Sequence, residues 1–65
     1  MRVIVNGEEV AVSVATLAAL LVVRGFEGEW LATAVNGRVA ANTARGEYRL
    51  EDGDRIEVLS PMQGG

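Results

Sequence analysis

The chain opens with MRVIVNGEEVAVSV (residues 1–14), a pattern that predicts a β-hairpin. Its Asn6-Gly7 pair is the strongest two-residue signal for a tight hairpin turn, because both positions tolerate a positive φ. In the first strand Val3 and Val5 alternate with Ile4, so we expect the two valines to face the core. Ile4 is then expected on the opposite face of the sheet.

The returning strand is predicted over residues 9–14, where valine occupies every second position. From Thr16 the apolar period becomes that of a helix, which we expect to span residues 16–24. Thr16 or Ser13 is suited to cap its start. Gly25 is in the position where a residue of left-handed conformation commonly ends a helix, so we expect the helix to end there.

The second half of the chain predicts a second hairpin and one more strand. We expect Phe26 and Trp30 to close one end of the core. The functional alternative is that the two aromatic rings stack on a base or a sugar. The remaining elements are a strand over 31–35, an Asn-Gly turn at 36–37, a short strand over 38–40, an irregular connection over 41–47 with one turn of 3₁₀ helix, a turn over 51–54, and a last strand over 55–59.

This order of elements predicts an α+β fold in which a mixed sheet of four to five strands wraps around one helix. A right-handed strand–helix–strand crossover places the helix on one face of the sheet, so the other face is left to solvent or to partners. Four apolar residues are expected to converge on that open face as a docking patch: Ile4, Ala32, Ala34 and Leu59.

Composition excludes several classes of function. The 65 residues form one domain, without cysteine for thiol chemistry and without histidine as metal ligand or general base. A net charge of −3 with scattered arginines argues against nucleic-acid binding. No apolar run approaches membrane-spanning length and no signal peptide opens the chain, so we expect a soluble, cytoplasmic protein. No serine has a base to activate it, so the chain is not expected to be an enzyme.

Acidic residues gather at EDGD (residues 51–54), with Glu57 close behind. The group resembles a cation loop superficially, but it lacks the alternating ligand register and the closing glutamate of calcium loops. We interpret it as a charged turn. No metal site is expected.

The chain ends in SPMQGG (residues 60–65), which we predict to be a flexible tail behind a folded domain of residues 1–59. Because Gly64 and Gly65 carry no side chain, such a tail can enter a narrow channel, with Met62 and Gln63 leading into it. A ragged, inert terminus is the alternative. All six basic side chains are arginines, so no side-chain amine here accepts an acyl group.

Taken together, VIVNGE (3–8), VNGRV (35–39), LEDGDRIEV (50–58) and MQGG (62–65) resemble the ThiS family, the sulfur carrier proteins of thiamin (thiazole) biosynthesis. The resemblance covers the whole chain and rests on the joint spacing of these pieces. It implies a ubiquitin-like β-grasp fold with the glycine tail projecting from the final strand. One departure is Thr33, which occupies an inward position where a larger aliphatic residue is usual, and this bears on the assignment of that strand's faces.

The resemblance also implies a mechanism and partners. A ubiquitin-activating-enzyme-like adenylyltransferase of the ThiF type would use MgATP to adenylate Gly65, while the chain itself binds no cofactor. A sulfur donor such as a cysteine desulfurase would supply the sulfur of a thiocarboxylate, and thiazole synthase of the ThiG type would accept it. Three alternatives stay open: a carrier like the small subunit of molybdopterin synthase, a ubiquitin-like protein modifier, and an interaction module with an inert tail.

Overall fold

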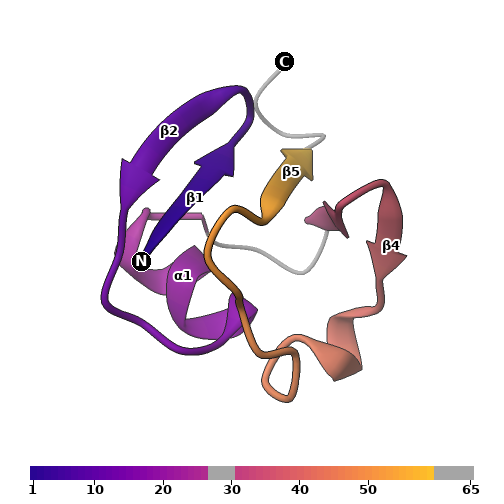
Figure 1. Ribbon diagram of the computed structural model, residues 1–65. Helices are drawn as coiled ribbons and strands as arrows, with labels where there is room; N and C mark the ends of the chain where they lie inside the picture. Colours follow the sequence, from indigo (N-terminus) through magenta and orange to yellow (C-terminus); the bar gives the residue numbers. More distant parts are fainter. Residues whose placement is uncertain (27–30, 60–65) are drawn as a thin grey trace.

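The computed structural model describes residues 1–26 and 31–59, which form a five-stranded sheet packed on a helix (Figure 1). The strands lie in the order β2-β1-β5-β3-β4. The elements are β1 (Arg2–Val5), β2 (Glu8–Ala11), α1 (Leu17–Val23), β3 (Ala32–Val35), β4 (Arg38–Ala40), the 3₁₀ turn η1 (Asn42–Ala44) and β5 (Arg55–Leu59).

The last strand of the sequence, β5, is the central strand of the sheet. It pairs in parallel with β1 and antiparallel with β3, while β1–β2 and β3–β4 are antiparallel hairpins. The two hairpins do not pair with each other, so the sheet becomes continuous only when β5 pairs with both. The mixed sheet around one helix confirms the predicted β-grasp class.

Both hairpins turn on the predicted Asn-Gly pairs. Asn6 and Asn36 have φ values of 49° and 53°, and each following glycine has a φ of 84°. Two successive positive φ values are those of a type I′ turn, whose twist matches that of the flanking strands. The two turns are therefore as the sequence predicts.

The second strand is shorter than predicted, because β2 ends at Ala11 rather than at residue 14. The reason lies in its partner. Arg2, the first residue of β1, is opposite Ala11. Beyond this pair, the Met1 amine donates to Val12 O at 3.0 Å and Val12 N–H donates to Met1 O at 2.8 Å, and no further residue of β1 faces residues 13 and 14. The valine alternation nevertheless holds, since Val12 and Val14 are half-buried against the core.

The helix α1 begins and ends as predicted. Thr16, not Ser13, is the N-cap, and its hydroxyl oxygen accepts a bond from Ala19 N–H at 3.2 Å. The N–H groups of Leu17 and Ala18 donate to carbonyls of Tyr48 and Arg45 in the β4–β5 connection. A helix of seven residues is too short to persist alone, so these bonds and its buried face hold it in place.

The helix ends in a Schellman arrangement. Gly25, at a φ of 80°, donates to Val22 O at 3.1 Å, and Phe26 N–H donates to Leu21 O at 2.9 Å. Phe26 packs against the core, as predicted, whereas Trp30 lies outside the described residues.

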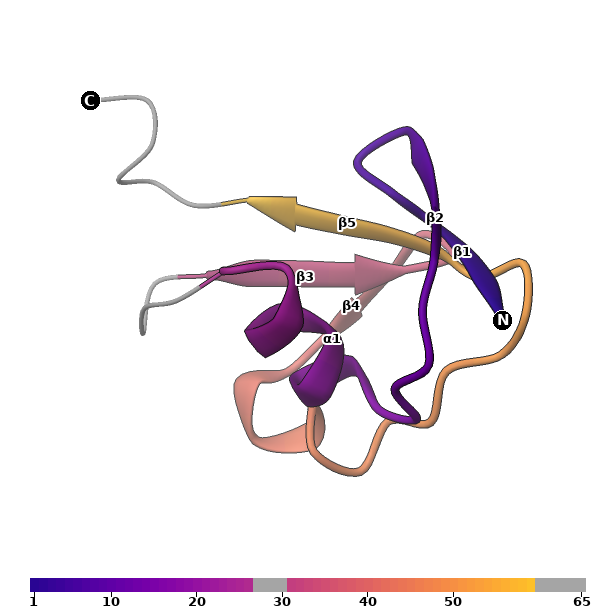
Figure 2. The same cartoon turned by 90° about the vertical axis from the view of Figure 1, so that its left-hand side faces the viewer.

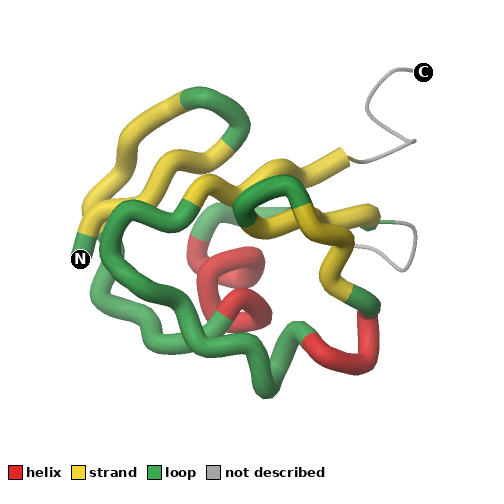
Figure 3. The backbone as a smooth tube through the Cα atoms, turned by 45° about the vertical axis from the view of Figure 1, so that its right-hand side comes forward, coloured by secondary structure: helices red, strands yellow, loops and turns green. Residues whose placement is uncertain are grey.

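The core fills the space between α1 and one face of the sheet, and Figure 2 shows this layering with the opposite face uncovered. In Figure 3 the connection from β4 to β5, including η1, runs along the helix side of the sheet. The fully buried side chains at the centre are Val3, Leu17, Leu20 and Ile56.

Thr33 is buried on the inner face of β3, which confirms the predicted faces of that strand. Its hydroxyl donates to Ala40 O at 3.1 Å and accepts from Nε of Arg45 at 3.2 Å. The same guanidinium donates to the carbonyl of Leu31. A threonine is accommodated where an aliphatic residue is usual because both hydrogen-bonding capacities of its hydroxyl are satisfied.

Two asparagine side chains hold β5 in place. Asn6 N–H donates to Ile56 O at 2.9 Å and its Oδ1 accepts from Val58 N–H at 2.8 Å. On the other side, Asn36 N–H donates to Arg55 O at 2.7 Å and its Oδ1 accepts from Arg55 N–H at 3.0 Å. Each amide oxygen accepts the bond that a continuing strand would accept with its main-chain carbonyl.

We expect Leu20→Ala to lower the free energy of unfolding by about 2–5 kcal/mol, because it removes a fully buried side chain between helix and sheet. Val22→Ala on the outer face of the same helix, where Val22 is 76% exposed, is the matched control and should stay within about 0.5 kcal/mol of the wild type. Urea denaturation followed by circular dichroism measures both. Equal losses in the two variants would contradict the described orientation of α1.

Asn36→Ala should lower the free energy of unfolding by about 2–3 kcal/mol, since it strains a positive-φ position and removes a donor to the buried Asp54 carboxylate. Asn36→Gly relieves the backbone strain and loses only the side-chain bonds, so about 1–2 kcal/mol is expected. The difference between the two denaturation curves separates conformation from hydrogen bonding. A glycine variant as stable as the wild type would show that the amide does not support β5.

Candidate functional site

The strand β5 leads directly into the tail. Its last residue, Leu59, pairs with Ala32 of β3 at the end of the sheet opposite to the N-terminus (Figure 2). The predicted tail residues Met62, Gln63, Gly64 and Gly65 lie outside the described residues, so their roles remain predictions. The structure shows what precedes them: a central strand fixed on both sides.

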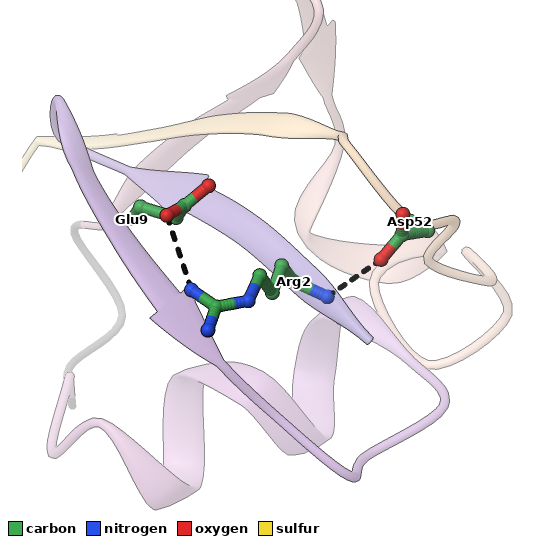
Figure 4. A network of polar contacts seen from close by, with 3 residues as sticks. All are labelled: Arg2, Glu9 and Asp52. Atoms are coloured by element: carbon green, nitrogen blue, oxygen red, sulfur yellow. Dashed lines mark hydrogen bonds and ion pairs between the residues drawn. The ribbon is translucent and has the colours of Figure 1, made fainter.

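The uncovered face of the sheet, which we call the open face, has a charged half over β2 and β1. There Arg2 donates to Oε1 of Glu9 at 3.1 Å, while its main-chain N–H donates to Oδ1 of Asp52 at 2.7 Å (Figure 4). Both residues of the ion pair are largely exposed, so it adds little stability. Its effect is to make this half of the face polar.

The other half of the open face, over β3, β4 and the end of β5, is apolar. It forms a shallow depression, which we call the apolar hollow after its four apolar residues Ala32, Ala34, Val39 and Leu59. The polar residues Asn6, Thr33 and Glu57 complete its lining. The register brings these residues together, because Ala32 is opposite Leu59 and Ala34 is opposite Val39. Leu59 and Val39 are 71% and 86% exposed, a level at which large aliphatic side chains gain by being covered.

Of the four predicted docking residues, three meet in the apolar hollow and Ile4 does not. Ile4 lies on the open face as predicted, but it is half-buried and its strand neighbours are Glu9 and Arg55. Leu59 is four residues further along β5 than Arg55. The prediction that all four converge is therefore corrected: the parallel β1–β5 register places Ile4 in the charged half.

Val39 was not among the predicted docking residues, although the sequence held the signal. A two-residue turn at Asn36-Gly37 pairs Val35 with Arg38, and so it pairs Ala34 with Val39 on one face. The strand register that this turn imposes therefore predicts Val39 next to Ala34, beside the predicted docking patch.

The acidic turn is occupied in holding the fold together. Oδ2 of Asp54 accepts from Glu51 N–H at 2.8 Å, and its Oδ1 accepts from Nδ2 of Asn36 at 3.0 Å. Asp52 accepts from Arg2 as described above. In residues 1–26 and 31–59 no three histidines, cysteines or carboxylates gather where they could hold a metal ion.

Within the described part of the chain, no helix has the length and apolar content needed to cross a membrane.

Comparison with known proteins places these features in a family. The model of the ThiS family matches residues 2–65. Among solved structures, the crystal structure of the thiamine biosynthesis protein ThiS from Geobacter metallireducens is similar, with a TM-score of 0.80 and 30% sequence identity over 100% of both chains. No curated protein sequence matches. The β-grasp sheet, the β5 strand leading to the glycine tail and the family match agree, and the chain belongs to the ThiS family.

Proposed function

We propose that this ThiS-family sulfur carrier of thiamine biosynthesis carries its sulfur as a thiocarboxylate on Gly65. The observation that carries the proposal is the family match over residues 2–65, which includes the terminal Gly64-Gly65 pair. The fold supports it, because the strand that precedes the tail lies inside the sheet and is paired with a neighbouring strand on both sides.

Activation of Gly65 is required by its chemistry. A carboxylate resists nucleophilic attack, so an adenylyltransferase of the ThiF type joins it to the α-phosphate of ATP, with Mg²⁺, and releases pyrophosphate. The resulting acyl-adenylate is an electrophile. This chain supplies the carboxylate and no catalytic side chain, so it acts as a protein co-substrate.

Sulfur then replaces the adenylate. A persulfide, formed from cysteine by a desulfurase, attacks the acyl carbon through its terminal sulfur and releases AMP. A thiol cleaves the acyl disulfide that results and is itself oxidised to a disulfide, which leaves the thiocarboxylate on Gly65. Thiazole synthase of the ThiG type accepts this sulfur.

The tail and the open face have complementary roles in this scheme. Six residues span at most about 20 Å when extended, so Gly65 reaches an active site only when the enzyme sits near the end of β5. The apolar hollow lies at that end, because Leu59 is both its rim and the last residue of the strand. We infer that partners dock on Ala32, Ala34, Val39 and Leu59, with Ile4 at the periphery, and receive the tail at a high local concentration.

Intact-mass measurement tests the reactive group. After incubation with the cognate adenylyltransferase, MgATP, cysteine and a desulfurase, the mass should rise by the difference between one sulfur and one oxygen atom. Fragmentation should place the change on Gly65.

A variant with one alanine appended after Gly65 is the control and should stay unmodified. An unchanged wild-type mass, under conditions in which the same enzymes modify a known carrier, would refute sulfur carriage. Adducts on lysines of other proteins would instead identify a protein modifier.

Leu59→Ser tests the docking role of the apolar hollow. We expect kcat/KM for adenylation to fall about tenfold, mainly through KM, because an exposed anchor of the contact loses its apolar surface. Val22→Ser, on the outer face of α1, makes the same kind of change at a 76% exposed site and should leave kcat/KM within about twofold. Equal kinetics for the two variants would place the docking surface elsewhere.

A further inference from the structure

Glu57 occupies a singular position on the open face. It lies on the central strand β5, directly opposite Ala34 of β3, and it borders the apolar hollow. It also lines the two neighbouring depressions, one beside Ile4 and Glu9 and one beside Asn36 and Gly37. A partner that covers the apolar hollow therefore also covers this carboxylate.

Within residues 1–26 and 31–59, the Glu57 carboxylate forms no ion pair. All six arginines lie in the described ranges, and their ion pairs there are Arg2–Glu9 and Arg24–Glu8. Arg55 is two residues away on the same strand face, but the two side chains form no ion pair. The cross-strand neighbour of Glu57 on β3 is Ala34, whose side chain offers no hydrogen-bond donor.

An unpaired carboxylate beside an apolar hollow constrains what can dock there. Covering it with an apolar surface would strip its water without replacement, which is costly for a charged group. Covering it with an arginine or lysine side chain replaces that water with a charge-assisted hydrogen bond. The hollow thus selects a partner that presents an apolar side chain next to a cationic one.

We propose that Glu57 is a specificity-determining residue, which the activating adenylyltransferase recognises with an arginine or lysine side chain while an apolar side chain fills the hollow of Ala32, Ala34, Val39 and Leu59. This proposal rests on the proposed function. Charge favours this enzyme as the occupant: it must hold an acidic chain of net charge −3 beside anionic ATP, so cationic groups on its docking surface offset the repulsion.

Charge reversal at Glu57 tests the proposal against a matched control. Glu57→Arg and Glu47→Arg each replace one negative charge with one positive charge, so the net charge changes from −3 to −1 in both. Glu47 is also exposed but belongs to the connection between β4 and β5. That connection runs along the helix side of the sheet (Figure 3). Only the position of the charge differs between the two variants.

The measured quantity is the rate of adenylation by the cognate enzyme, determined from the pyrophosphate released. We expect Glu57→Arg to lower kcat/KM at least about tenfold through KM, Glu57→Gln about threefold, and Glu47→Arg less than twofold. The loss in Glu57→Gln should shrink as salt is raised, because screening weakens the wild-type charge pair. Circular dichroism melts check that all variants are folded.

Two results would overturn the proposal. If Glu57→Arg and Glu47→Arg lose activity equally, net charge and not Glu57 determines recognition. If neither loses activity while the wild type is adenylated normally, Glu57 has no role in docking. A wild type that is not adenylated at all would instead refute the proposed function, so the two failures are distinguishable.

Discussion

The fold depends on how β5 is held between two hairpins that do not pair with each other. The side-chain oxygen of Asn6 accepts a hydrogen bond from Val58 N–H, and that of Asn36 accepts one from Arg55 N–H. Both bonds lie where the hairpin has already begun to turn away from β5. One residue type thus forms the turn through its positive φ and extends the sheet through its amide. This double use explains why a small sheet with a single short parallel pairing is nevertheless continuous.

The same arrangement relates the fold to its proposed function. A tail that must enter an enzyme's active site benefits from a base that does not move with it, and β5 is fixed on both edges up to Val58. The apolar hollow includes Leu59, the last residue of β5, which is paired with Ala32 of β3. In the proposed function, recognition and delivery would therefore lie at the same end of β5.

Most of the elements were predictable because their signals are local. Both Asn-Gly turns, the Thr16 cap, the Gly25 terminator and the inward valines of β1 follow from φ preferences and side-chain period. The end of β2 could not be predicted in this way, because it depends on where the partner strand β1 ends. The position of Ile4 relative to Leu59 could not be predicted either, because it depends on the parallel register of strands about fifty residues apart in sequence.

By itself, the sequence determined the turns, the helix, the inward and outward faces of each strand and the glycine tail, because each is set by residues within a few positions of one another. Tertiary structure alone decided that the last strand would be central and that Ile4 would lie apart from Leu59. It also placed Leu59 opposite Ala32, and Glu57 opposite Ala34 beside the hollow. These outcomes arise from pairings between distant strands, where hydrogen-bond register and not local preference fixes which side chains become neighbours.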